Sequence, residues 1–244
     1  MKIIAVSNIK GGVGKTTTAV NLSYLCAAGG AATLLWDLDP QGAATYLLRG
    51  EPAAKISARK LVLGKRELPE FIVRTDHPEL DLLPADLSYR HFDVHLGERK
   101  RPTERLLRMS RSLRSAYAAL FLDCPPGISL LSENVLRAAD AVVVPLVPSP
   151  LSVRMLVQLR EFITDQGWTD MLVLPFFSMV DRRRRAAVNR AAFRSEARPC
   201  SGNIRALRDS QAPPGCAPSR PRRPPARQVP KPYPTACAAG PAPQ

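Results

Sequence analysis

Short apolar runs alternate with longer amphipathic segments through the first 180 residues of the chain. The run at residues 2–6 precedes a glycine-rich turn, and residues 16–28 then predict a helix that ends at Gly29 and Gly30. Because helix-length segments separate most of the runs, the pattern predicts strands joined by crossover connections. The further strand-length runs lie at residues 33–36, 80–83, 118–122, 141–146 and 171–174.

These apolar runs are nearly continuous and do not alternate with polar residues, which is typical of parallel strands that helices cover on both faces. The pattern therefore predicts an α/β fold with a doubly wound, mostly parallel sheet and helices on both faces. In such sheets, ligands bind at the carboxyl ends of the strands. The polar clusters SNIKGGVGKTTT, DLDPQG and DCPPG follow the first, second and fourth runs, so we expect a site where these clusters meet.

The composition excludes several classes of protein. With 244 residues, 45% of them hydrophobic and 23% charged, the chain resembles an ordinary globular protein. Its longest apolar stretch, at residues 141–146, is far too short to cross a bilayer, and its first residues do not resemble a secretory signal. The five cysteines are widely spaced and form no metal-ligand pattern. We therefore expect a soluble cytoplasmic protein with no disulfide framework, zinc site or stable membrane association.

The formal net charge of +14 is unevenly distributed along the chain. Residues 1–180 hold 21 Lys and Arg against 18 Asp and Glu, whereas residues 181–244 hold 14 against 3, together with 12 of the 24 prolines. Such a composition favours disorder, since it offers no periodic apolar face to bury. We therefore predict one domain at residues 1–185 and a disordered tail rich in Arg, Pro and Ala at residues 186–244.

The strongest chemical signal is the loop IKGGVGKTTT between the first predicted strand and helix. Glycines allow backbone N–H groups to curl around a phosphate, and the positive end of the following helix adds to the attraction. On such a loop Lys15 reaches the β- and γ-phosphates of a nucleotide, and the hydroxyl of Thr16 is a ligand for Mg²⁺. The residues expected to bind the nucleotide are Lys10, Gly11, Gly12, Val13, Gly14, Lys15, Thr16 and Thr17.

The loop departs from the usual GxxxxGK[ST] pattern, because Ile9 occupies the first glycine position and Lys10 adds a second lysine. In this form, KGGVGKTT resembles the deviant Walker A motif of the ParA/MinD family of partition and positioning ATPases. WDLDPQG, at residues 36–42, resembles the first switch of the ParA branch. LFLDCPPG, at residues 120–127, resembles its Walker B strand and second switch, and VVVPLVPSPLSV, at residues 142–153, is similar to the strand and turn that follow.

The resemblance implies an ATP-dependent sandwich dimer with Mg²⁺ as the metal. Lys10 corresponds to the lysine that crosses to the partner's nucleotide, where a cation supplied in trans acts like an arginine finger. Asp39 matches the acid that orients the attacking water, and Asp123 matches the Walker B acid. We thus expect Lys10, Lys15 and Asp39 to be catalytic and Thr16, Asp123 and Asp39 to serve the metal. A helix cap or a surface ion pair is the alternative role for each carboxylate, most of all for Asp37.

Three other features have a structural and a functional interpretation. The Pro-Pro-Gly after Asp123 predicts a stiff turn that responds to the γ-phosphate. Cys124 is expected to be a packed residue, because no His or Asp stands near it in the sequence to activate a nucleophile. His91 and His95 have helical spacing that zinc can use, but they lack the Glu of HExxH, which favours a solvated helix face.

The expected function is an ATPase that segregates plasmid or chromosome DNA, binds nonspecific DNA at the nucleoid as a homodimer and responds to a ParB-like cargo adaptor. A MinD-like or cellulose-synthesis-associated positioning ATPase is one alternative, although the chain shows no amphipathic membrane helix. An inactive relative that binds nucleic acid through its basic tail is another. A small-molecule synthase with a related loop is a third, and it would need substrate-binding residues that the sequence does not reveal.

The resemblance continues to MVDRRRR, at residues 179–185, and stops there. Full-length members of the family continue through two more strand and helix units, which supply adenine contacts and a basic surface facing DNA. We expect a frameshift or early divergence near residue 185, with the missing pattern encoded in another reading frame. A genuine basic arm is the alternative. Residues 182–185 then either bind phosphate backbones or form a solvated charge run.

Overall fold

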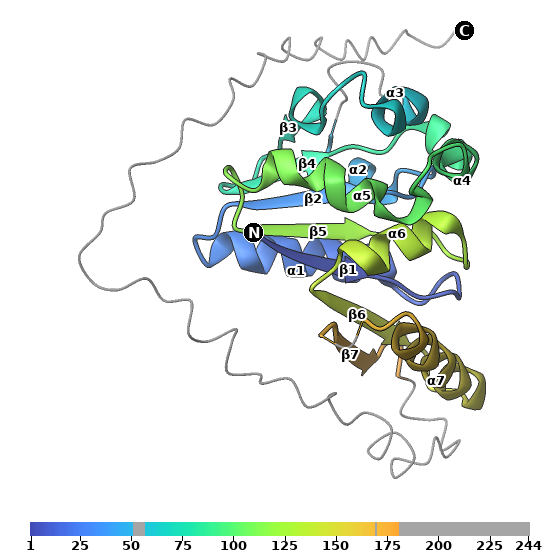
Figure 1. Ribbon diagram of the computed structural model, residues 1–244. Helices are drawn as coiled ribbons and strands as arrows, with labels where there is room; N and C mark the ends of the chain where they lie inside the picture. The colour runs from blue at the N-terminus through green and yellow to red at the C-terminus, as the bar shows by residue number, and fades with distance from the viewer. Residues whose placement is uncertain (51–56, 169, 181–244) are drawn as a thin grey trace, which may run out of the picture.

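The computed structural model describes residues 1–50, 57–168 and 170–180. Its centre is a seven-stranded sheet in the order β3-β4-β2-β5-β1-β6-β7, and all neighbouring strands are parallel except the pair β3 and β4 (Figure 1). The strands are β1 (Lys2–Val6), β2 (Thr33–Asp37), β3 (Val73–Arg74), β4 (Leu80–Leu83), β5 (Ala119–Asp123), β6 (Ala141–Leu146) and β7 (Leu172–Phe177).

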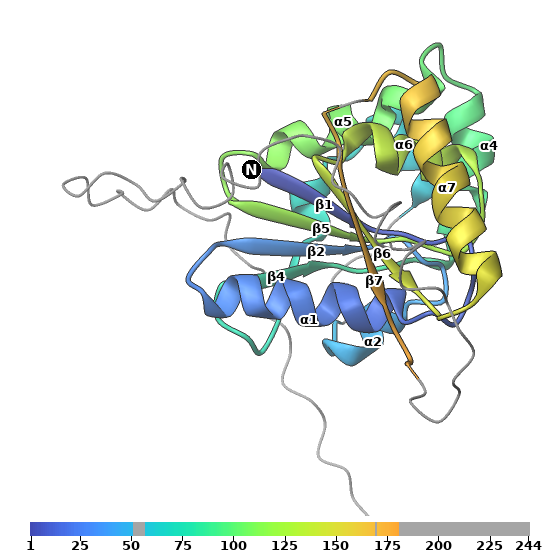
Figure 2. The same ribbon diagram turned by 90° about the horizontal axis from the view of Figure 1, so that it is seen from below.

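Helices cover both faces of the sheet, as the sequence predicts (Figure 2). One face carries α1 (Lys15–Ala28) and α2 (Ala43–Leu47). The other face carries four α-helices of 5 to 16 residues. Four short 3₁₀ helices lie in the connecting segments of the described chain. These α-helices are α4 (Phe92–Gly97), α5 (Arg105–Met109), α6 (Leu130–Ala138) and α7 (Pro150–Asp165), and α3 (Ala58–Leu63) packs beside α4; the 3₁₀ turns are η1 (Leu68–Phe71), η2 (Leu87–His91), η3 (Pro102–Glu104) and η4 (Ser110–Leu113).

Two apolar clusters lie on opposite faces of the sheet, and the strands supply alternate residues to each. Trp36, which is fully buried, belongs to the larger cluster under α4 to α7, whereas its neighbour Leu35 belongs to the cluster under α1. All five residues of β2 and of β5 are buried. Burial on both faces explains why the strands appear in the sequence as continuous apolar runs.

The observed strands differ from the predicted ones at a few ends. The fourth run extends one residue further than predicted, to Asp123, and β7 continues to Phe177 instead of ending at residue 174. The antiparallel strand β3 was not predicted. It has two residues, with Val73 paired to Leu82, and its position at the sheet edge depends on this pairing and not on an apolar run of its own.

The register aligns the carboxyl ends of the three central strands. Asp123 at the end of β5 lies beside Val6 of β1 on one side and Asp37 of β2 on the other. The polar clusters that follow these strands therefore meet at one edge of the sheet, as expected.

Residues 181–244 lie outside the described residues. The boundary at residue 185, the disorder of the tail and the frameshift therefore stay predictions, as does any role of residues 182–185. Within the described ranges, no helix combines the length and apolar character needed to cross a membrane.

Candidate functional site

The glycine-rich loop joins the end of β1 to the start of α1. Its backbone is left-handed at Gly12 and Gly14, with φ of +68° and +91°, a conformation that L side chains rarely adopt. Gly14 is also the N-cap of α1, and it provides no side-chain cap for the first turn. The N–H groups at the positive end of this 14-residue helix are therefore free to bind an anion.

Lys15 lies across this loop. Its side chain is buried, and its Nζ donates a hydrogen bond of 3.0 Å to the carbonyl oxygen of Lys10. Burial lowers the pKa of Lys15, while the negative charges of Asp123 and Asp39 act in the opposite direction. The ammonium group is thus held at the loop, close to Asp123 at the end of β5 and Asp39 just after β2.

Asp123 is the least satisfied carboxylate in the described part of the chain. Both of its carboxylate oxygens are buried, and neither has a hydrogen-bond partner within the described ranges. Burial raises the pKa of Asp123 to about 7, although the Thr16 hydroxyl and the charge of Lys15 favour the ionised form. A buried carboxylate without a partner, beside a threonine hydroxyl, fits a hard divalent cation that takes oxygen ligands.

Asp37 is aligned with Asp123 but has different surroundings. Its carboxylate accepts hydrogen bonds of 2.8 Å from both the N–H and the hydroxyl of Thr45, and one of 3.2 Å from the N–H of Asp39. Burial raises its pKa, and the bonds from Thr45 oppose the shift. Asp37 therefore anchors the start of α2, which is the structural role that the sequence left open.

Asp39 is half-buried, and its Oδ1 accepts a hydrogen bond of 2.9 Å from the N–H of Gln41. Its charge influences the pKa of Lys15 and of Asp123, so the three groups share one site. The other predicted lysine, Lys10, is exposed at the outer side of the loop. Lys10 is thus exposed and Asp39 half-buried, whereas Lys15 and Asp123 are buried.

The Pro-Pro-Gly turn contacts the loop directly. The N–H of Gly127 donates a hydrogen bond of 3.0 Å to the carbonyl oxygen of Ile9, and Gly127 has a φ of +114°. Ahead of the turn, Cys124 is buried, and its Sγ lies 3.6 Å from the carbonyl oxygen of Leu122. Burial raises the pKa of this thiol well above its usual range. Cys124 is therefore a packed residue, as predicted.

Comparison with known proteins gives the family. Residues 1–167 match the model of the AAA_31 family, described as an AAA domain. The chain is 37% identical over 166 residues to the chromosome partitioning protein ParA of Caulobacter vibrioides, an alignment covering 67% of this chain and 62% of that protein. It is 31% identical over 193 residues to the chromosome-partitioning ATPase Soj of Treponema pallidum, covering 76% and 74%. The chain belongs to the ParA/MinD family of P-loop ATPases. It lies in the partitioning branch.

Solved structures share the ParA/MinD fold. Cobyrinic acid a,c-diamide synthase from Mycobacterium smegmatis, solved with ADP and magnesium, is 32% identical with a TM-score of 0.70, and the match covers 81% of each chain. A plasmid partition protein from Borrelia burgdorferi is 22% identical with a TM-score of 0.69, covering 80% of this chain and 84% of that one. The chain spans about 62% of the length of the Caulobacter relative.

Sequence reasoning missed Asn8, which links the glycine-rich loop to the sheet. Asn8 is buried; its Nδ2 donates a hydrogen bond of 2.7 Å to the carbonyl oxygen of Pro145 in β6, and its Oδ1 accepts one of 3.0 Å from the N–H of Lys10. The sequence could have indicated this role, because Asn8 is an amide residue placed directly between a strand and a glycine-rich loop.

The histidine pair lies apart from this site. His91 and His95 have ring centroids 6.5 Å apart at the junction of η2 and α4, and His95 Nδ1 lies 4.0 Å from Glu98. Within residues 1–50, 57–168 and 170–180, no three His, Cys, Asp or Glu side chains form a group suited to a metal ion.

Proposed function

We propose that this chain binds Mg²⁺-ATP at the P-loop and hydrolyses it slowly, as a homodimer that acts in plasmid or chromosome segregation. The observation that supports this most directly is the buried, unpartnered carboxylate of Asp123 beside Lys15 and the uncapped start of α1. The site thus combines fixed donors for an anion with an oxygen ligand for a cation. The M. smegmatis synthase, which shares the fold at 32% identity, was solved with ADP and magnesium.

In this proposal the glycine-rich loop and the end of β5 hold the phosphates and the metal. The N–H groups of residues 11–17 and the Lys15 ammonium donate to phosphate oxygens, and Lys15 gives up its bond to the Lys10 carbonyl to do so. The Thr16 hydroxyl and the Asp123 carboxylate hold Mg²⁺, directly or through water. Bound Mg²⁺ would neutralise negative charge that develops on the phosphates.

Asp39 and the exposed Lys10 take part in the reaction itself. Asp39 is half-buried at the site and orients the attacking water, while Lys10, at the outer side of the loop, extends to the nucleotide of a second copy. The same edge of the sheet exposes apolar side chains, which a second copy would cover. They are Tyr46 at 83%, Leu47 at 57%, Ile128 at 76% and Leu151 at 56% exposure.

Nonspecific DNA and a ParB-like adaptor are the proposed partners, with the nucleoid as the place of action in the cytoplasm. The partitioning functions named for the Caulobacter and Treponema relatives support this choice. A positioning ATPase at a membrane would instead require binding to anionic vesicles, which a cosedimentation assay with and without ATP measures directly.

The decisive experiment is ATP turnover by the full chain, with and without nonspecific DNA. We expect Lys15→Ala to abolish turnover and Lys10→Ala to reduce it by about 10³-fold, as for loss of a finger-type cation. The control is Lys2→Ala, which removes an exposed lysine at the opposite end of β1, 3.8 Å from Asp140. No turnover in a folded wild-type preparation would show an inactive relative, and turnover that survives Lys15→Ala would refute this site.

A small-molecule synthase is distinguished by what turnover requires. An ATPase of this kind hydrolyses ATP without a second substrate, whereas a synthase couples hydrolysis to one. Turnover of purified protein with ATP and DNA alone therefore supports the partition function. Turnover that appears only after a small-molecule extract is added supports a synthase.

A further inference from the structure

The end of β7 reaches the glycine-rich loop, although the two segments lie near opposite ends of the described chain. Ser178 follows β7 directly, and Gly14 is the last glycine of the loop and the N-cap of α1. A Cβ atom at Gly14 would lie 3.2 Å from the Oγ of Ser178, which is closer than most contacts that Cβ atoms make. The hydroxymethyl group of Ser178 therefore packs against the backbone of Gly14 and occupies the space that a side chain would need.

This contact distinguishes Gly14 from the other two glycines of the loop. A Cβ atom at Gly11 or Gly12 would meet no described atom within 4 Å, so both positions are open on that side. Gly14 is also the residue from which α1 begins. A shift of its backbone would therefore move the N–H groups at the start of α1, which are the donors that an anion needs.

Ser178 is itself held in place by β6. Its N–H donates a hydrogen bond of 2.8 Å to the carbonyl oxygen of Leu146, one residue beyond the pair formed by Leu146 and Phe177. Directly after Ser178 the chain turns, because Met179 has a left-handed backbone with a φ of +54°, which residues other than glycine rarely adopt. The strand pairing and the turn together fix the place at which Ser178 meets the loop.

The other end of the loop is attached to β6. The side chain of Asn8 donates to the carbonyl oxygen of Pro145 in β6 and accepts from the N–H of Lys10. Asn8 stands before the loop glycines, and Gly14 is the last of them. Strands β6 and β7 therefore contact the loop at both of its ends.

Within the described part of the chain, β7 is an edge strand with β6 as its one neighbour (Figure 1). Its side chains Leu174 and Phe176 are each 38% exposed, whereas all five residues of β5 at the centre of the sheet are buried. Strands with few buried contacts open locally at a lower free-energy cost than central strands. The contact with Gly14 thus joins an easily opened strand to the start of α1.

We propose that Ser178 is a positioning residue for the glycine-rich loop, and that nucleotide binding and closure of the β7 end stabilise each other through its contact with Gly14. Phosphates bound by the N–H groups of the loop fix the backbone of Gly14, which gives Ser178 a fixed surface to pack against. Such coupling is reciprocal, so a closed β7 end raises nucleotide affinity by the same factor by which nucleotide favours closure. This inference rests on the proposed binding of nucleotide, but not on hydrolysis or on DNA.

The test compares Mg²⁺-ADP binding by variants of the full chain. Ser178→Ala removes the Oγ that contacts Gly14, and Ser178→Thr keeps it. The matched control is Ser115→Ala, which removes an exposed hydroxyl ahead of β5, at the opposite edge of the sheet. We expect Ser178→Ala to weaken ADP binding about fivefold in a calorimetric titration. Ser178→Thr and Ser115→Ala should bind ADP as the wild type does.

Hydrogen exchange separates this positioning role from a general loss of stability. In the wild type, ADP should slow exchange in residues 172–178 as well as in residues 10–18. In Ser178→Ala with saturating ADP, residues 10–18 should remain protected, while residues 172–178 lose the protection that ADP gives. Without nucleotide, Ser178→Ala should exchange faster than the wild type in residues 10–18, whereas Ser115→Ala should not.

Three outcomes would overturn the inference. The first is equal ADP affinity for Ser178→Ala and Ser115→Ala, and the second is protection by ADP in residues 10–18 but not in 172–178 of the wild type. The third is a Ser178→Thr variant that binds ADP as weakly as Ser178→Ala. A wild type that binds no ADP would refute the proposed function instead, and exchange of residues 10–18 without nucleotide would still decide whether Ser178 positions the loop. Circular dichroism melting checks folding, and Ser178→Gly provides the test if Ser178→Ala does not fold.

Discussion

At the scale of single residues, Asp37 and Asp123 show how surroundings decide the role of a side chain. The two carboxylates are aligned at the ends of adjacent strands, and both are buried. Thr45 and the Asp39 N–H satisfy Asp37, whereas neither oxygen of Asp123 has a partner among the described residues. The sequence predicts that acids lie here, but it does not show which of them is held by hydrogen bonds at the start of α2 and which is left without a partner among the described residues.

The first prediction concerns the pH dependence of stability without nucleotide or metal. The folded state raises the pKa of Asp123 from 3.8 to about 7, so it binds more protons than the unfolded state between these values. Stability from this group is therefore present at low pH and lost as pH rises from about 4 to about 7, by up to about 4 kcal/mol in all, of which about 3 kcal/mol is lost between pH 5 and pH 8. Urea unfolding of wild type and Asp123→Asn at pH 5 and pH 8, with a chelator, measures it. An equal pH slope for both proteins would contradict the assignment.

A second prediction concerns Asn8. Asn8→Ala removes the bonds to the Pro145 carbonyl and the Lys10 N–H, which detaches the loop from β6. We expect a loss of about 1–3 kcal/mol in stability, and ADP binding weakened about tenfold because the loop is no longer preorganised. Calorimetric titration of ADP measures the second effect. Asn21→Ala, which loses one exposed bond on α1, is the control and should leave ADP affinity unchanged.

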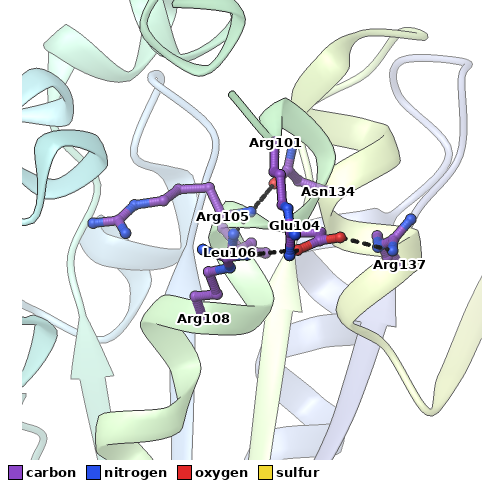
Figure 3. A network of polar contacts seen from close by, with 7 residues as sticks. All are labelled: Arg101, Glu104, Arg105, Leu106, Arg108, Asn134 and Arg137. Carbon is purple, nitrogen blue, oxygen red and sulfur yellow. Dashed lines mark hydrogen bonds and ion pairs between the residues drawn. The ribbon is translucent and has the colours of Figure 1, made fainter. Parts of the chain in front are cut away.

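At the scale of elements, the parallel strands were predictable, whereas the antiparallel strand β3 and the short helices were not. Strands buried on both faces appear as apolar runs, so β1, β4 and β6 were predicted with the observed bounds. The segment between β4 and β5 contains only 3₁₀ turns and five- or six-residue helices, which are too short for a 3.6-residue period to emerge. Its conformation depends on tertiary contacts, among them the hydrogen bonds of Asn134 (Figure 3).

A third prediction therefore concerns Asn134. Asn134→Ala removes three hydrogen bonds that join α6 to η3 and α5 and one within α6, and it leaves the N–H groups of Arg105 and Leu106 without their acceptor. We expect a loss of about 3 kcal/mol in stability. Hydrogen exchange should increase first in residues 102–113, since these lose their attachment to α6. The exposed neighbour Arg137→Ala, which breaks one contact with Glu104, should change stability by less than about 0.5 kcal/mol.

At the scale of the whole molecule, the sequence predicted the family and the glycine-rich loop but not the distribution of charge. Positive and negative charges are nearly equal in number in residues 1–180, and most of the excess positive charge lies in residues 181–244. In the fold, two separate basic segments, residues 57–71 and 98–114, pack together around a cavity. A motif can be recognised in the sequence because its residues are contiguous. The two basic segments are far apart in the sequence and come together only in the fold, so the composition of the whole domain does not reveal them.

The last prediction concerns assembly. Tyr46, Ile128 and Leu151 expose apolar surface at the same edge of the sheet as the P-loop, and a second copy that brings Lys10 to the opposite nucleotide must cover this edge. Tyr46→Ser with Ile128→Ser should therefore weaken dimerisation in a slowly hydrolysed ATP analogue by at least tenfold, from lost apolar burial, while ADP binding is retained. Mass photometry across a concentration series measures the dissociation constant.

Leu25→Ser is the matched control for that measurement, because Leu25 is 63% exposed in the last turn of α1, at the end of the helix away from the P-loop. Removal of a similar apolar side chain there should leave the dimer intact. If the double variant and the control dimerise equally, the exposed residues at the site do not form the interface. A monomer in the wild type with ADP and a dimer with the analogue would show that assembly responds to the γ-phosphate, and Lys10 would then be expected to act only in the dimer.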